Sequence, residues 1–562
     1  MTDIEYINSS KVQNGINKLA DSIRAERNES ESFLEIYADK KVINRLKNHN
    51  NQIIYGRRGS GKTHLLLALA EALVEESSNR KVIPVYIDLR KLLPLITEID
   101  NSKEETSILI FQQIINDILQ RLVRNLKNIF DIKEFGTKKL LEHVKEGKLK
   151  DISEKLNIEF DGRKLKKLGA VEFSEEEISK IAGSLNISKN PSINIEGLRE
   201  LKNIKSDQYI KYVSFSEISK NLNELLYALN DVKIVCLLDE WSELPIKLQP
   251  YIAELLKRTF IASNYTFKIA AIPYRSNFRN TNDEDSKIGL EEGGDIFPLS
   301  LDNRYIFETD KSGTRDFYNE LLVKHLKDID ESLFENVDEG KYLNLFFANQ
   351  ALSEILIASA GIPRDFLHLF ILSYNNRTNQ KQRIVLKNIR NATSEWYSTD
   401  KKEEIEKDKS IKFLFEGIVN EIVIGKKKTH FLLPQKYSDN PHIKKLNDLR
   451  VLHLRQKGIS HKHISNKVYD VYSIDYGSYT SLDIAKNTLD TEYPQISQDL
   501  KTVEDIRDAR SLSLEEDFFD KFILEIGEGI KCKNQGCGKT IDTNHLAYKK
   551  QNMCNYCYEI QE

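Results

Sequence analysis

The sequence predicts an α/β fold built on a parallel sheet, followed by helices, a winged-helix-like region and a small metal-binding tail. Three observations support this prediction: apolar strand-like runs alternate with helical patterns, a glycine-rich loop follows the first run, and four cysteines gather near the C-terminus. The chain has 562 residues, more than one hydrophobic core usually serves, so several domains are expected. Its net charge of −3 excludes a uniformly basic nucleic-acid coat, so any DNA contact must be regional.

Four short apolar runs are expected to form the sheet, at residues 51–55, 81–90, 232–240 and 267–272. Because helical patterns separate them, the strands should be parallel. More than a hundred residues lie between the second and third runs. Their amphipathic patterns predict a helical insertion at about 101–212.

Changes of pattern divide the chain into six predicted parts. They are an N-terminal segment (1–32), a nucleotide-binding domain (33–302), a helical lid (303–404), a winged-helix-like domain (405–490), a helical linker (491–528) and a zinc ribbon (529–562). The longest apolar runs are far shorter than the roughly 20 residues that cross a bilayer, and the first residues show no signal pattern. We therefore expect a cytoplasmic protein without a membrane segment.

The winged-helix-like prediction rests on the region from 411 to 470. Twelve lysines and arginines oppose five acidic residues there, and helical patterns up to about 458 precede a stretch that reads as a hairpin. The positive excess is either a phosphate-contacting surface for DNA or an ordinary solvated face.

The strongest motif is the loop GRRGSGKT, which spans Gly56 to Thr63 between the first apolar run and a helix-forming stretch. Backbone N–H groups of such a loop surround phosphates, and the helix N-terminus adds positive potential. Lys62 is expected to neutralise the β- and γ-phosphates of ATP, and Thr63 to offer its hydroxyl to Mg²⁺. The remaining loop residues assigned to ATP are Gly56, Gly59, Ser60 and Gly61.

Acidic residues follow the third apolar run at the point where a parallel strand should end. Asp239 is expected to hold Mg²⁺, and Glu240 to orient or deprotonate the attacking water. Two arginines are candidate γ-phosphate sensors. Arg275 follows the next strand, and Arg364 stands in GIPRDFL at the start of a lid helix, after a proline suited to that position.

Together, GRRGSGKT, IVCLLDE, the strand FKIAAI and the lid sequence GIPRDFL resemble the origin-recognition/initiator (ORC/CDC6-like) clade of AAA+ ATPases. The resemblance implies a P-loop fold, Mg²⁺-dependent ATP hydrolysis, a sensor role for Arg364 and DNA contact through the winged helix. It also implies nucleotide-dependent homo-oligomers. Lys62, Asp239, Glu240 and Arg364 would be the catalytic residues. The sequence departs from the clade at sensor 1, where Pro273-Tyr274-Arg275 stands in place of the usual asparagine.

The long insertion and the cysteine tail look more like bacterial relatives in antiviral defence or DNA maintenance. Two functions are therefore weighed. The first is an ATPase that acts on or with DNA. The alternative is a slow-turnover ATP switch that controls assembly with a partner effector protein.

The tail holds two close cysteine pairs, Cys532 with Cys537 and Cys554 with Cys557. Four thiolates in two pairs are typical of a tetrahedral zinc site, and a closed set of this kind is structural rather than catalytic. His545 could replace one ligand. The fifth cysteine, Cys236, lies within an apolar strand and is expected in the core.

Overall fold

The structure is a computed structural model. It describes residues 2–23, 32–80, 82–92, 233–260, 264–280, 288–302, 304–348, 350–379, 381–426, 428–461, 467–481, 512–514 and 516–561, together with short pieces between 103 and 223. These residues form two compact units. One consists of Arg24–Asp302, and the other joins Met1–Ile23 to Asn303–Glu562. The sequence does not predict that the N-terminal segment belongs with the second half of the chain.

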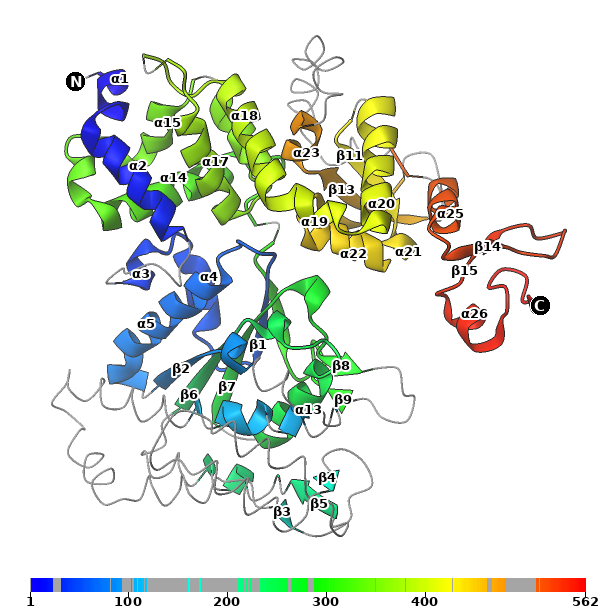
Figure 1. Ribbon diagram of the computed structural model, residues 1–562. Helices are drawn as coiled ribbons and strands as arrows, with labels where there is room; N and C mark the ends of the chain where they lie inside the picture. The colour runs from blue at the N-terminus through cyan, green and yellow to red at the C-terminus, as the bar shows by residue number, and fades with distance from the viewer. Residues whose placement is uncertain are drawn as a thin grey trace, which may run out of the picture. The chain divides into compact units, whose positions relative to one another are not determined.

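The first unit is organised around a five-stranded parallel sheet with the order β10-β1-β7-β6-β2 (Figure 1). The four predicted strands are all present, with bounds that differ by one to three residues. The fifth, β10, is new. The strands are β1 (Gln52–Tyr55), β2 (Val82–Asp88), β6 (Lys233–Asp239), β7 (Tyr265–Ala271) and β10 (Phe297–Ser300).

Helices cover both faces of the sheet because the strand residues are apolar on both sides. On one face, α4 (Lys40–Leu46) and α5 (Lys62–Arg80) pack against alternate strand residues such as Ile54 and Val235. On the other, α13 (Gln249–Phe260) and residues 108–118 pack against the intervening ones, which include Cys236 as expected. Since all five strands are parallel, their carboxyl ends meet at one edge.

Most of the predicted insertion at 101–212 lies outside the described residues. Its described part contains helical residues near 103–118, as expected. It also contains a small antiparallel sheet of β3 (Phe160–Asp161), β5 (Ile210–Val213) and β4 (Val171–Glu172), which the helical patterns do not predict. A second short antiparallel pair, β8 (Arg279–Asn280) with β9 (Ile288–Gly289), lies against α13.

The second unit begins with a helical lid. Asp310 caps its first long helix by accepting a hydrogen bond from the N–H of Gly313, and Pro363 begins α17, where the missing N–H costs nothing. The two N-terminal helices pack on this lid, α2 against both α14 and α17 (Figure 1). The helices are α1 (Asp3–Ile7), α2 (Ser10–Ser22), α14 (Lys311–Ile329), α15 (Tyr342–Phe346), α16 (Ala351–Ala358), α17 (Pro363–Asn375) and α18 (Leu386–Trp396).

Beyond the lid, the chain runs helix, strand, two helices, two strands, which is the element order of a winged helix. The elements are α20 (Lys409–Val419), β11 (His430–Pro434), α21 (Gln435–Ser438), α22 (Pro441–Asp448), β12 (Leu452–Ser460) and β13 (Val468–Ile474). The strands form an antiparallel sheet in the order β11-β13-β12.

Two details of the winged-helix prediction are wrong. The stretch from 452 to 458 is a strand and not the end of a helix, because α22 stops at Asp448 and Arg450 adopts a left-handed φ of 61°. Conversely, Tyr476–Ser481 forms the helix α23 where a strand was expected.

The tail returns to this domain. Residues 512–514 pair with β11, through Leu432 N–H to Leu512 O (2.6 Å) and Leu514 N–H to Leu432 O (2.9 Å). Helix α25 (Glu516–Glu525) follows, and then β14 (Gly529–Lys531), β15 (Thr540–Asp542) and α26 (Leu546–Gln551). No helix among the described residues is sufficiently long and apolar to span a membrane.

Candidate functional site

The glycine-rich loop lies between β1 and α5, at the carboxyl edge of the parallel sheet. Gly59 and Gly61 have left-handed φ values of 82° and 86°, which only glycine adopts freely. A Cβ on Gly56 would lie 2.2 Å from Ser60 Oγ, so the loop closes tightly at its start.

Polar groups converge on the same loop. Lys62 Nζ donates to the carbonyl oxygens of Gly56 (2.7 Å) and Arg57 (3.1 Å). Ser60 Oγ is buried and accepts or donates no hydrogen bond within the described residues. A buried lysine, an unsatisfied hydroxyl and the start of a 19-residue helix form a donor set that fits the phosphates of a nucleotide.

Asp239, the last residue of β6, reaches this loop. Its carboxylate accepts hydrogen bonds from Tyr86 Oη (2.8 Å) and from the N–H of Glu240 (2.9 Å), and the Thr63 side chain lies close to it. Burial raises the pKa of Asp239, while these donors and the charge of Lys62 oppose the shift. Thr63 and Asp239 are thus adjacent, as the oxygen ligands of one Mg²⁺ must be. The pair fits that ion.

Glu240 follows with an unusual backbone. Its φ of 57° is left-handed, a conformation that costs a non-glycine residue on the order of 1 kcal/mol or more. The next residue, Trp241, is fully buried and stacks on Phe278 with ring centroids 5.0 Å apart. This anchor holds the chain after β6 and keeps the side chain of Glu240 about one-fifth exposed.

Arg90 lies beside Glu240, with Nη1 3.8 Å from Oε1. The same guanidinium is held by Asp88, to which Nη2 donates at 2.8 Å. Burial, and then the charge of Asp239, raises the pKa of Glu240, whereas Lys62 and Arg90 lower it. The protonation of Glu240 therefore depends on the balance between burial with Asp239 and the positive charges of Lys62 and Arg90.

Tyr86 and Arg90 contact the two acids but belong to none of the motifs in the sequence. Both belong to β2 or the turn directly after it, and β2 is the neighbour of β6 in the sheet. The available signal is their position, because polar residues at the end of an apolar parallel strand face the same edge as the loop.

The sensor candidates are placed differently. Arg275 lies in a short 3₁₀ turn that follows β7, a neighbour of both β1 and β6, so it belongs to the same edge. Arg364 is in the second unit, in the first turn of α17. The structure thus brings together Lys62, Thr63, Asp239 and Glu240. Their catalytic and binding roles, and those of Arg275 and Arg364, stay predictions.

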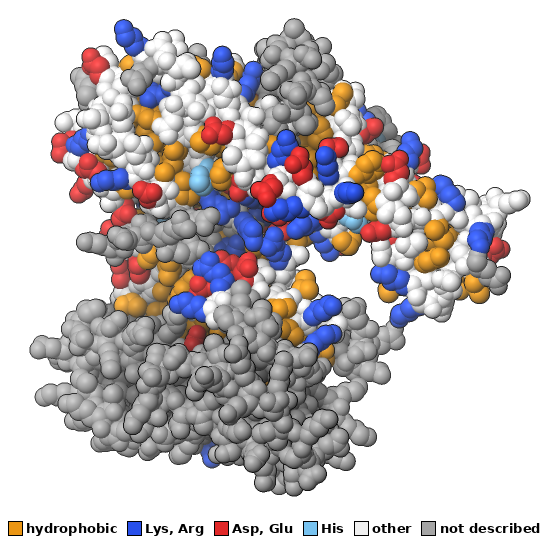
Figure 2. Space-filling model, in the orientation of Figure 1, with side chains coloured by type: hydrophobic (Ala, Val, Ile, Leu, Met, Phe, Trp, Pro, Cys, Tyr) orange, Lys and Arg blue, Asp and Glu red, His pale blue; other side chains and the backbone are white. Residues whose placement is uncertain are grey.

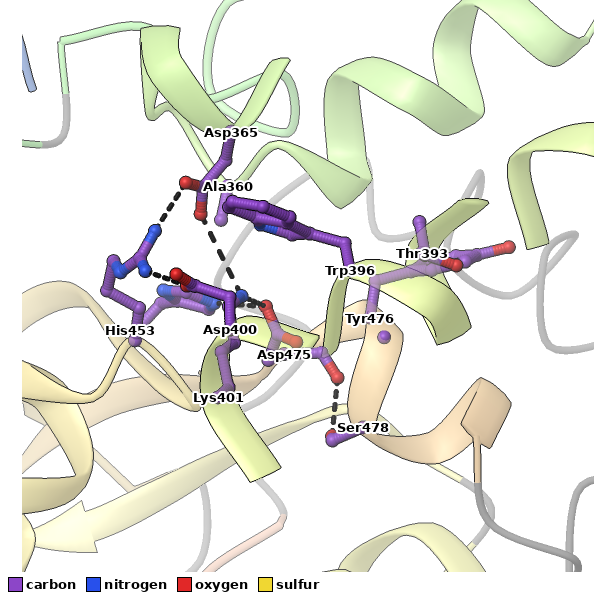
Figure 3. A network of polar contacts seen from close by, with 12 residues as sticks. Ala360, Asp365, Thr393, Trp396, Asp400, Lys401, His453, Asp475, Tyr476 and Ser478 are labelled. Atoms are coloured by element: carbon purple, nitrogen blue, oxygen red, sulfur yellow. Dashed lines mark hydrogen bonds and ion pairs between the residues drawn. The ribbon is translucent and has the colours of Figure 1, made fainter. Parts of the chain in front are cut away.

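The residue after Arg364 enters a buried ionic network that joins the lid to the winged-helix-like domain (Figure 3). Asp365 pairs with Arg450, whose guanidinium also bonds Asp400. Lys401 Nζ lies 2.6 Å from Asp475 and 3.8 Å from Asp365. Burial alone would raise the pKa of Asp365, yet Arg450 and Lys401 hold it below its usual value. The lid helix α17 is therefore tied to Arg450, in the turn before β12, and to Asp475, directly after β13.

This network changes the interpretation of the basic segment at 411–470. Arg450 and Arg455 are buried, and neither is available to a phosphate. Five of the other described members also pair with acids, among them Lys412 with Glu416 and Lys426 with Glu421. Figure 2 shows red and blue side chains interspersed over this region. Further pairs are Lys436 and Lys467 with Glu516, and Lys444 with Asp439. Four acids outside the segment, Glu308, Asp365, Asp400 and Glu516, offset part of the positive excess.

The four tail cysteines form one cluster, with every Sγ within 4.8 Å of the others. Cys532 and Cys557 lie 3.6 Å apart, and Cys537 and Cys554 3.9 Å apart. A tetrahedral ion with Zn–S bonds of about 2.3 Å needs sulfur separations of roughly 3.8 Å, so the cluster fits zinc. His545 is not part of it, since its Nδ1 accepts from Ala547 N–H at the start of α26.

Comparison with known proteins agrees with a nucleotide-binding site at the glycine-rich loop. A model of the ORC-CDC6-like family matches residues 18–355, well over half of the chain. Similar solved structures include the ORC1 protein of Aeropyrum pernix in complex with DNA (12% identity, TM-score 0.28, 82% of this chain and 98% of that one). They also include the ORC2 protein of the same organism in ADPNP–ADP complexes (14%, 0.26, 87% and 95%). No curated protein matches the sequence.

Proposed function

Because the chain belongs to the ORC-CDC6-like family, we propose that it is a Mg²⁺-dependent ATPase whose nucleotide state governs its association with DNA. The observation that supports this best is the proximity of Thr63 and Asp239, which come from distant parts of the sequence and lie side by side at the glycine-rich loop. That contact assembles a phosphate-binding loop and a metal-binding acid at one edge of the sheet.

The residues divide the work as follows. Lys62 and the loop N–H groups bind the β- and γ-phosphates and offset their charge. Thr63 and Asp239 hold Mg²⁺, which supplies Lewis-acid charge to the phosphate oxygens when bound. Glu240 accepts the proton of the attacking water, which requires its ionised form. Arg90 favours that form, and Tyr86 fixes the orientation of Asp239.

DNA association is proposed for the winged-helix-like domain. Its helices α21 and α22 follow β11 and precede the β12–β13 hairpin, so α22 occupies the position of a recognition helix. A role in bacterial defence or DNA maintenance, homo-oligomers that depend on nucleotide and a partner effector are further predictions of this proposal.

A second candidate is the slow-turnover switch. Glu240 is held 3.8 Å from Arg90 in a left-handed backbone, and a carboxylate engaged by an arginine is a weaker base. Under this alternative the protein binds ATP, hydrolyses it slowly and uses the bound state to control assembly with a partner effector.

The test is ATP binding, turnover and particle mass, each with and without duplex DNA. Lys62→Ala should lose ATP binding, whereas Lys247→Ala, an exposed lysine in the same unit, should retain it. Glu240→Gln should bind ATP but turn it over at least about 100-fold more slowly. Full ATP binding by Lys62→Ala would contradict the proposed site. Negligible turnover by the unmodified protein, with an ATP-dependent increase in mass, would favour the switch.

A further inference from the structure

Helix α25 packs on α20, α21 and α22 of the winged-helix-like domain, and three aromatic contacts hold it there. Phe519 stacks on Tyr437 of α21 with ring centroids 4.1 Å apart. Phe522 meets the ring of His442 in α22 edge to face at 5.3 Å, and stacks at 6.3 Å on Phe413 of α20. The apolar side of α25 is thus packed against this domain.

The polar side of α25 is acidic and faces basic groups. Glu516 pairs with Lys436 of α21 at 3.2 Å and accepts a hydrogen bond from Lys467 at 3.0 Å, next to the start of β13. These two lysines lower the pKa of Glu516. The described residues of the helix hold three more acids, Asp517, Asp520 and Glu525, against the single base Lys521.

The helix is fixed at both of its ends. Before it, residues 512–514 extend the domain's own sheet at the edge of β11, and Lys426 Nζ donates to Ser513 O at 3.0 Å. After it, Glu528 lies 3.8 Å from His442 Nε2. Contacts on both flanks reduce the entropy lost when the helix docks.

Helix α25 covers the surface of α21 and α22 through which a helix-turn-helix would contact DNA. In a helix-turn-helix the N-terminal residues of the second helix contact base edges, while nearby lysines contact phosphates. Here the second helix is α22, and the side chain of His442 near its N-terminus is only 15% exposed because Phe522 and Glu528 lie beside it. The charge of Glu516 offsets the charges of Lys436 and Lys467, so both lysines attract a phosphate less strongly while α25 is in place. Below, Lys436, Tyr437, His442 and Lys467 are called the α21–α22 face.

We propose that α25 is an intramolecular cover for the α21–α22 face, and that duplex DNA competes with it. The carboxylate of Glu516 occupies the place of a backbone phosphate between the two lysines. DNA binding therefore requires α25 to leave, and anything that displaces the tail raises DNA affinity. This inference rests on the proposed DNA association and adds a regulatory step to it.

The test compares two variants of the full-length, zinc-loaded protein. Glu516→Gln removes the charge that holds both lysines. Asp517→Asn removes the same charge from the exposed neighbouring position, so it controls for general electrostatics. Affinity for a fluorescein-labelled duplex of random sequence is measured by anisotropy at low salt. Glu516→Gln should bind about fivefold more tightly than Asp517→Asn, the ratio expected when two exposed ion pairs are lost.

Amide hydrogen exchange gives a second, independent readout. Exchange across Glu516–Glu525 should speed up when the duplex is added to the unmodified protein. Protection that stays constant would show that α25 is a permanent part of the DNA-bound domain and would overturn the proposal.

The measured DNA affinities also show whether the cover alone is wrong or whether the proposed DNA association is wrong as well. Equal affinities for the two variants, with clear binding by the unmodified protein, would overturn the cover and leave the proposed function intact. Absence of binding by every variant would overturn both the cover and the proposed DNA association, while ATP binding is judged separately through Lys62→Ala.

Discussion

Thr63, in the first turn of α5, lies close to the carboxylate of Asp239 at the end of β6. The contact exists because only β7 separates β6 from β1 in a parallel sheet, so the residues that follow these strands meet at one edge. It joins the two halves of the proposed nucleotide site.

The Thr63 hydroxyl should matter to nucleotide affinity mainly when Mg²⁺ is present. Thr63→Val keeps the shape of the side chain but removes the hydroxyl that lies close to Asp239 and offers an oxygen to the metal. We expect the affinity for ATP to fall about 10-fold or more with Mg²⁺, since hydrogen bonds to charged groups contribute about 1.5–3 kcal/mol. Titration with a fluorescent ATP analogue, with Mg²⁺ and with EDTA, measures the effect. Thr63→Ser should restore most of it, and an equal loss in EDTA would argue against a metal role.

Arg90 should set the acid limb of the pH–rate profile. Burial and Asp239 raise the pKa of Glu240, and Arg90 opposes them, so Arg90→Met should raise that pKa further. Because the base must be ionised, activity should be lost at a higher pH than in the unmodified enzyme. The measurement is kcat/KM for ATP hydrolysis against pH. Arg258→Met, which removes a 2.6 Å pair with Glu254 on α13, serves as the control and should leave the limb unchanged. An acid limb that moves to lower pH in Arg90→Met contradicts the assignment.

The buried network should stabilise the second unit strongly once it is formed. Lys401→Met leaves the buried carboxylate of Asp475 without its 2.6 Å partner, and such a loss costs about 3–5 kcal/mol of unfolding free energy. The exposed pair of Lys407 with Glu404 is the comparison, because Lys407→Met should cost less than about 1 kcal/mol. Urea unfolding can be followed by Trp396, which stacks on His368 in this unit, in a Trp241→Phe background. Similar costs for the two variants would show that the network adds nothing beyond a surface pair.

The tail should contain one zinc ion and depend on it. Native mass spectrometry is expected to find one zinc per chain, lost in Cys557→Ser but retained in Cys236→Ala, whose thiol lies in β6. Without zinc, amide exchange should rise across β14 and β15, because this small sheet has few core residues besides the cysteines. Retention of zinc by Cys557→Ser would contradict a four-cysteine site.

Local sequence patterns predicted the parallel sheet well, since each strand around the site is a continuous apolar run. The fold class and the ORC/CDC6-like resemblance are confirmed. The fifth strand, β10, was not foreseen because it is short, contains a proline and exposes three of its four residues. The boundary between α22 and β12 was missed because Lys, Arg and Leu residues suit both a helix and a half-buried strand.

Contacts between distant segments explain the other omissions. The sequence placed Asp239 correctly beside the loop, but the position of Tyr86 and Arg90 at the end of the neighbouring apolar strand does not by itself say that they reach the two acids. The basic segment likewise looked uncompensated, because its partners Asp365 and Glu516 lie outside it.

The position of the first 23 residues affects how the chain can be divided. Tyr6 Oη donates to Leu333 O at 2.7 Å, Tyr374 Oη donates to Ile7 O at 2.6 Å, and Ile16 is fully buried in the same unit. A fragment that starts at residue 303 would lack α1 and α2 and would expose the apolar side chains that these helices cover. Residues 24–302 form the other compact unit and interrupt this one in the sequence, so any version of the second unit must keep residues 1–23 together with those from 303 onward.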